Sequence, residues 1–159
     1  MYDLTILTIT HDDKFLDLFR RQIHDQVAVG SPMIVAGTID EACSLLKTAR
    51  PRLIVMHWAR DSGSYEQLDR LLWTTTVVAR RVPVLVITER YRTDQATMMY
   101  RMGVSEYISR SHHLDQLGAI FSPYLPFAQL AVEPRASLDQ PNKTWSSNHK
   151  AGAITTQAV

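Results

Sequence analysis

The stretch ARPRLIVMHW, residues 49–58, holds a nearly uninterrupted apolar run from Leu53 to Met56 just after a proline. A strand that is apolar on both faces is typical of a parallel sheet covered by helices on both sides. The stretch therefore predicts a buried central strand. In folds of this kind, strands and helices alternate along the chain.

The rest of the chain to about residue 123 repeats that alternation. Short β-branched and apolar segments bounded by turn residues predict four more strands, at residues 4–9, 33–36, 82–87 and 105–109. Segments with apolar residues at helical spacing predict five helices, over residues 12–27, 38–50, 65–78, 93–102 and 114–121. The expected fold is α/β, a doubly wound, flavodoxin-like sheet of five parallel strands with five helices.

Local signals support the helix boundaries. Thr38 and Glu41 have the spacing of a capping box, in which each side chain accepts a hydrogen bond from the backbone at the helix start. Gly103 is placed to end the fourth helix, and Pro123 to stop the fifth. Residues 1–126 are therefore expected to form one domain.

Residues 127–159 are rich in Pro, Ser, Thr, Asn and Ala and show no periodicity, which predicts a flexible C-terminal tail or linker. The sequence leaves open whether this segment is a natural end or leads to an effector domain.

The composition excludes several classes of protein. The chain has 17 basic and 16 acidic residues, a balance that argues against a nucleic-acid or membrane-surface protein. No apolar run reaches the roughly 20 residues that span a bilayer, and the first residues do not resemble a signal peptide. The single cysteine, Cys43, excludes an internal disulfide. A cytoplasmic protein without a cofactor is expected.

Four stretches in this order resemble the receiver domain of bacterial two-component response regulators, over about residues 3–123. They are ILTITHDDKFLDLF at residues 6–19, ARPRLIVMHW at 49–58, VPVLVIT at 82–88 and ATMMYRMGVSEYISR at 96–110. The resemblance implies the (βα)5 receiver topology. It also implies a site at the carboxyl ends of the strands, where ligands bind in open α/β sheets.

The resemblance implies that the phosphorylation pocket is degenerate. An active receiver holds Mg²⁺ with two acidic residues after the first strand, and these positions fall on Thr10 and His11, with Asp12 next. The phospho-accepting aspartate falls on His57, and the lysine after the fifth strand falls on Arg110. Two further positions match the family: the phosphate-binding hydroxyl as Thr88 and the switch aromatic as Tyr107.

These differences remove the groups that the chemistry needs. Phosphoryl transfer to a receiver requires a carboxylate nucleophile and a hard cation, and Mg²⁺ requires oxygen ligands. A hydroxyl and two imidazoles do not meet that need. A shift of the alignment by one residue would turn Asp12 inward, but His57 would still replace the nucleophile. We therefore expect a non-catalytic pseudo-receiver that regulates by phosphorylation-independent protein–protein interaction.

Two alternatives remain open at the same pocket. His11 and His57 should lie close together, and with Asp12 and Glu89 they could bind Zn²⁺, Ni²⁺ or Cu²⁺, or respond to pH. The chain could also be an unusual receiver that is still phosphorylated in a phosphorelay, through Asp12 or Asp61. Arg110 could clamp Asp12 or Glu89 and fix one conformation.

The resemblance also indicates an interaction face on the fourth helix, fifth strand and fifth helix. Met98, Met99 and Met102 crowd the fourth helix, beside Tyr107 on the fifth strand. Methionine forms adaptable binding surfaces, although it also fills core gaps. The expected partner is a kinase, an effector or a second copy of the chain. No nucleotide-binding, nucleophile-elbow or zinc-protease motif occurs, which gives no support to an enzyme.

Overall fold

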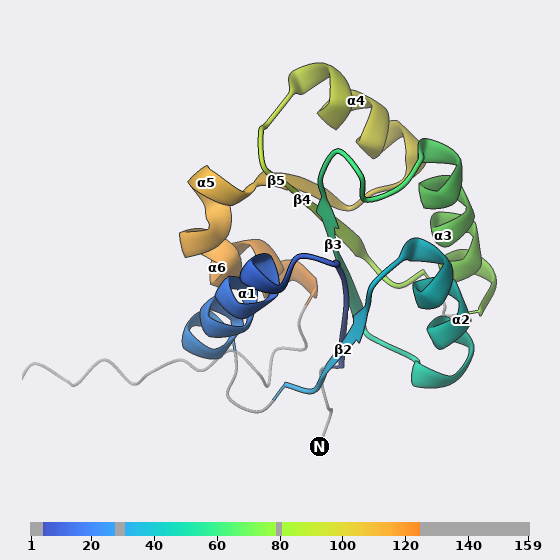
Figure 1. Ribbon diagram of the computed structural model, residues 1–159, viewed down its shortest axis with the longest axis horizontal. Helices are drawn as coiled ribbons and strands as arrows, with labels where there is room; N and C mark the ends of the chain where they lie inside the picture. Colours follow the sequence, from blue (N-terminus) through green and yellow to red (C-terminus); the bar gives the residue numbers. More distant parts are fainter. Residues whose placement is uncertain (1–4, 28–30, 79–80, 125–159) are drawn as a thin grey trace, which may run out of the picture.

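The computed structural model describes residues 5–27, 31–78 and 81–124, and in them one parallel sheet has the strand order β2-β1-β3-β4-β5 (Figure 1). The strands are β1 (Ile6–Ile9), β2 (Met33–Ala36), β3 (Leu53–Trp58), β4 (Val84–Thr88) and β5 (Glu106–Ser109). Because β1 pairs with both β2 and β3, the winding of the sheet reverses between β1 and β3. The predicted doubly wound α/β fold is confirmed.

Helices cover both faces of this sheet. They are α1 (Asp13–Gln26), α2 (Ile39–Ala49), α3 (Tyr65–Val78), α4 (Thr93–Met102), α5 (Arg110–His113) and α6 (Leu117–Phe121). In Figure 1, α1, α5 and α6 lie on one side of the sheet, and α2 and α3 lie on the other. Two short 3₁₀ turns, η1 (Leu114–Gln116) and η2 (Ser122–Tyr124), flank α6.

The sheet separates two apolar cores because successive strand residues point to opposite faces. Along β3, Ile54 and Met56 pack into the core beneath α2, α3 and α4. Their neighbours Leu53 and Val55 pack against α1 and α6 in the second core. All six residues of β3 are buried, as the sequence predicted for a central parallel strand.

Two predicted helix boundaries are confirmed in detail. The Thr38 hydroxyl accepts the N–H of Glu41 at 3.2 Å, and the Glu41 carboxylate accepts the N–H of Gly37 at 2.7 Å. Gly103 ends α4 with φ of 110°, a left-handed conformation that favours glycine. These contacts satisfy backbone groups that have no partner within the helix.

The last helix differs from the prediction. A single helix was expected over residues 114–121, but the helical segment starts at Arg110 and is divided into α5, η1 and α6. Ser109 lies just before α5, and its backbone N–H donates to Nδ1 of His113 at 3.0 Å. The expected domain boundary at residue 126 and the tail at 127–159 lie outside the described residues.

Within the described ranges, no helix combines the length and the apolar character needed to cross a membrane.

Candidate functional site

His57 lies near the carboxyl end of β3, at the centre of the sheet edge where β1, β3 and β4 end. Its side chain is 3% exposed. Residues of β3 and β4 are aligned so that His57 pairs with Ile87, which places Thr88 and Glu89 just beyond it. On the α1 side, the ring of Phe15 stacks on the imidazole with centroids 4.0 Å apart. The stack thus fixes the ring plane of His57 against the core, and the two ring nitrogens are the atoms that can bond to other residues of the site.

Both ring nitrogens of His57 have hydrogen-bond partners. Nδ1 lies 3.2 Å from the hydroxyl of Thr10, and that hydroxyl accepts the N–H of Asp12 at 3.0 Å. Nε2 lies 3.0 Å from Oε1 of Glu89. A carboxylate only accepts, so Nε2 donates to Glu89 and the Thr10 hydroxyl can donate to Nδ1. One neutral tautomer satisfies every one of these groups.

Glu89 receives a second donor from Arg110. Nη1 of Arg110 lies 2.7 Å from the same Oε1 that His57 contacts. Burial raises the pKa of the Glu89 carboxyl. The hydrogen bonds from Arg110 and His57 lower this pKa by a larger amount, so it lies below its ordinary value. Arg110 was expected to clamp Asp12 or Glu89, and the structure shows the clamp on Glu89.

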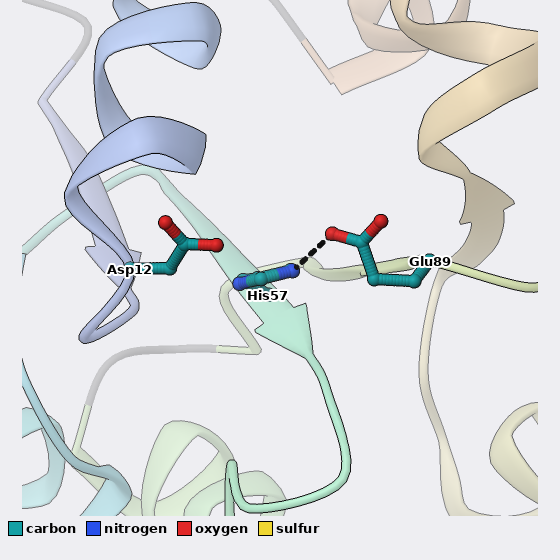
Figure 2. Close-up of side chains that lie close together, drawn as sticks. All are labelled: Asp12, His57 and Glu89. Atoms are coloured by element: carbon teal, nitrogen blue, oxygen red, sulfur yellow. Dashed lines mark hydrogen bonds and ion pairs between the residues drawn. The ribbon is translucent and has the colours of Figure 1, made fainter.

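Asp12 lies on the other side of the imidazole (Figure 2). It caps α1, and its Oδ1 accepts the backbone N–H groups of Lys14 and Phe15 at 2.9 and 3.1 Å. The N–H of Phe15 is the main cause that holds the pKa of Asp12 below its ordinary value. Asp12, His57 and Glu89 each offer one ligand atom, and these three atoms lie within 4.8 Å of one another.

The expected pairing of His11 with His57 is wrong. Thr10 is 6% exposed and turns inward, whereas the next residue, His11, points out, and its side chain is 49% exposed. Nε2 of His11 lies 3.2 Å from Oδ2 of Asp61, on the loop after β3. Of these two residues after β1, Thr10 contacts His57 and His11 contacts Asp61 instead. In the described part of the chain, the group with metal-ligand spacing contains Glu89 in place of His11.

The predicted interaction face is less exposed than its sequence indicated. Met99 and Tyr107 are interior residues, at 0% and 2% exposed, and Met102 packs against the core. Met98 and Tyr100 are exposed at 37% and 45%. The Tyr107 hydroxyl donates to the side chain of Gln95 at 2.6 Å, which fixes the ring inward.

Thr88, which was expected as the phosphate-binding hydroxyl, also has a local partner. The Thr88 side chain is buried, and its hydroxyl donates to the carbonyl of Arg90 at 3.2 Å. Thr88 pairs with Trp58 in the sheet, and its hydrogen bond to Arg90 leaves it outside the hydrogen-bonded group of Thr10, His57, Glu89 and Arg110.

Two members of the site were underestimated from sequence. Glu89 was expected only as a neighbour, yet it accepts from both His57 and Arg110. Phe15 was assigned to the apolar face of α1, which is correct, but its contact with His57 was not foreseen. The position of Glu89 directly after β4 was the available signal, because such positions meet at the active edge of a doubly wound sheet.

Solved structures share this fold. The signal receiver domain of a DNA-binding response regulator from Colwellia psychrerythraea matches with a TM-score of 0.65 at 16% identity, over 76% of this chain and 97% of that one. A response regulator from Hahella chejuensis matches with a TM-score of 0.65 at 15% identity, over 77% and 96%. The phosphorylated cyanobacterial phytochrome response regulator RcpA matches with a TM-score of 0.62 at 18% identity, over 82% and 99%.

The chain has the receiver-domain fold. At these identities the likeness concerns the fold, which hosts sites of differing chemistry. No protein-family model matches the sequence, and no curated protein matches it. The function of this chain therefore depends on the side chains at the edge of its sheet.

Proposed function

We propose that this protein is a pseudo-receiver, a non-catalytic interaction module of bacterial two-component-type signalling that works in the cytoplasm without phosphorylation. The observation that carries the proposal is the position of His57. Its imidazole fills the place at the end of β3 where the receiver resemblance puts the phospho-accepting carboxylate, and both of its nitrogens are already engaged.

The first support is the absence of a suitable nucleophile at that position. An acyl phosphate forms only on a carboxylate, and His57 offers a ring that is 3% exposed under Phe15. Nε2 points at the Glu89 carboxylate, so an incoming phosphoryl group would meet a negative charge in place of a cation. The described pocket thus opposes transfer both chemically and electrostatically.

The second support is the contact of Arg110 with Glu89. In a receiver, the resemblance assigns the position of Arg110 to the cation that binds the phosphoryl group. Here the guanidinium is bonded to Glu89 at 2.7 Å, and that carboxylate also holds His57. The Glu89 carboxylate therefore binds the guanidinium that would otherwise be available to a phosphoryl group. This contact favours a single conformation over a phosphate-dependent switch.

The third support concerns the partner surface. Met98 and Tyr100 are exposed on α4, and the Tyr100 hydroxyl accepts the backbone N–H of Tyr107 on the neighbouring β5. We infer that a protein partner (a kinase, an effector or a second copy of the chain) contacts this surface. Exposed methionine and tyrosine side chains both suit such contacts.

Incubation with acetyl phosphate and Mg²⁺, followed by intact mass measurement, tests the proposal. A phosphorylatable receiver, treated in parallel, is the positive control. We expect no phosphoryl adduct on this chain. An adduct would overturn the proposal, and its position would identify the acceptor. An adduct on Asp12 or Asp61 would show an unusual receiver, and the Asp61→Asn and Asp12→Asn variants distinguish the two.

A further inference from the structure

Asp12, His57 and Glu89 converge from three different elements on one small volume at the sheet edge. Asp12 precedes α1, His57 belongs to β3 and Glu89 follows β4. Their three ligand atoms lie within 4.8 Å of one another (Figure 2). Ligand atoms around one transition-metal ion lie about 2.0–2.2 Å from it, so small side-chain rotations would close this group on a single ion.

We propose that this group binds a divalent transition-metal ion, such as Zn²⁺, Co²⁺ or Ni²⁺, through Nε2 of His57 and one carboxylate oxygen each from Asp12 and Glu89. One imidazole and two carboxylates suit these ions, with the remaining positions open to water. This ligand set is not the all-oxygen Mg²⁺ site that the receiver resemblance implies. Its nitrogen comes from β3, and one of its carboxylates comes from the residue after β4.

The surroundings of His57 allow Nε2 to bind a metal while Nδ1 keeps its hydrogen bond to Thr10. Nε2 faces Glu89 at 3.0 Å and becomes a ligand if its proton moves to Nδ1. Nδ1 would then donate to the Thr10 hydroxyl, which already lies 3.2 Å away. A hydroxyl both donates and accepts, so Thr10 can serve either tautomer. A metal-bound histidine usually has such an oxygen partner on its other nitrogen.

Asp12 can bind an ion while it still caps α1. Its Oδ1 accepts both backbone N–H groups of the cap, so Oδ2 is not needed for the cap. Phe15 fixes the imidazole from the α1 side, so the ring does not need to be ordered on binding. A preformed ring and a preformed carboxylate reduce the entropy that binding would otherwise lose.

Arg110 is the built-in competitor of the ion. Its guanidinium holds Oε1 of Glu89 at 2.7 Å and balances part of the charge of the two carboxylates. A dication at the site would repel Arg110 and replace it on Glu89. Arg110 is also the first residue of α5, so its release would change a contact between the site and that helix. Metal binding therefore competes with the Arg110–Glu89 bond.

The test is titration of the full chain with Zn²⁺ by calorimetry, together with Co²⁺, whose visible absorption reports coordination directly. Asp12→Asn keeps a good helix cap but loses the carboxylate, and Glu89→Gln keeps the shape of its side chain. Each should weaken binding on the order of 10-fold or more, because each removes a ligand charge. Arg110→Gln should tighten binding, since the competing charge is removed.

His11→Gln is the matched control, because His11 lies outside the group and pairs with Asp61. A double His112→Gln, His113→Gln variant controls for the adjacent histidines of α5. Circular dichroism and thermal unfolding of each variant without metal establish that it folds. Equal affinity in these controls and weaker affinity in both ligand variants would support the site. No binding of Zn²⁺ or Co²⁺, or binding that survives Asp12→Asn or Glu89→Gln, would overturn it.

Discussion

The imidazole of His57 lies flat on the ring of Phe15, with ring centroids 4.0 Å apart and an angle of 3° between the planes. This stack makes a polar residue at the sheet edge part of the α1 core. His57 therefore has two roles, packing through its face and hydrogen bonding through its nitrogens, and substitutions can separate them.

His57→Phe keeps the ring and removes both hydrogen bonds, whereas His57→Asp removes the stack and buries a carboxylate close to Glu89. We expect the aspartate variant to lose more stability than the phenylalanine variant, by about 2 kcal/mol or more, because a buried charge beside a like charge is costly. Mg²⁺ should stabilise His57→Asp alone, since only that variant gathers three carboxylates. Urea unfolding with and without Mg²⁺ measures both effects. A more stable aspartate variant would contradict this description of the site.

The bond between Glu89 and Arg110 should contribute little to global stability. The two side chains are 46% and 28% exposed, so solvent screens their attraction. A double-mutant cycle of Glu89→Gln and Arg110→Gln should give a coupling free energy of about 0.5–1 kcal/mol that shrinks at high salt. Urea unfolding at low and at high ionic strength gives the free energies of unfolding of the natural chain, the two single variants and the double variant. Arg101→Gln, which replaces an exposed residue of α4, is the control for loss of a positive charge. A coupling free energy that does not depend on salt would show that the pair is not electrostatic.

Truncation of the methionines of α4 should cost stability in proportion to how deeply each side chain is buried. Met99→Ala removes a side chain that is 0% exposed and should cost about 2–4 kcal/mol through the cavity that it leaves. Met98→Ala, one position earlier and 37% exposed, should change stability by less than about 0.5 kcal/mol. Thermal unfolding compares the two. If a partner contacts α4, Met98→Ala should weaken that contact although the fold is intact. Similar stability losses in both variants would contradict the observed burial.

Tyr124 should make the domain sensitive to alkaline pH. Burial, and the Glu106 carboxylate that accepts the hydrogen bond of its hydroxyl, raise the pKa of Tyr124 to about 12 from an ordinary value of 10.0. The folded chain keeps this proton after the unfolded chain has lost it. The contribution of Tyr124 is therefore complete below the unfolded pKa and is lost as the pH rises toward the folded one.

The corresponding measurement is the melting temperature as a function of pH, from neutral to strongly alkaline. Tyr124→Phe should lose less stability above pH 10 than the natural chain does, because phenylalanine has no proton to release. Tyr91→Phe, on the loop after β4, is the control. If Tyr124→Phe and the natural chain fall in parallel, Tyr124 does not supply this dependence.

The sequence predicted the fold well because its strongest signals are local. The apolar run of β3, the capping box at Thr38 and the glycine at 103 each identify an element without knowledge of its neighbours. The helical segment after β5 was harder to predict. The helix from Arg110 onward is divided by a 3₁₀ turn, and no change of hydrophobic period marks that division.

The site was predicted only in part. Which strand ends meet follows from the fold, so His57 and Arg110 were correctly placed at one edge. Thr10 and His11 were both expected in the pocket, but only Thr10 of these two contacts His57, because the direction of each side chain in the turn after β1 depends on local backbone geometry. Side-chain partners such as Arg110 and Glu89 depend on rotamers, which the sequence pattern does not encode.

The most direct measurement of the central claim is thermal unfolding with and without Mg²⁺ and beryllofluoride, a mimic of the phosphoryl group on aspartate. A ligand that binds only the folded state must raise the melting temperature. We predict no shift for this chain and a clear shift for a phosphorylatable receiver run beside it. A rise of several degrees that requires both Mg²⁺ and beryllofluoride would contradict the claim that the pocket around His57 has lost its phosphate-dependent switch.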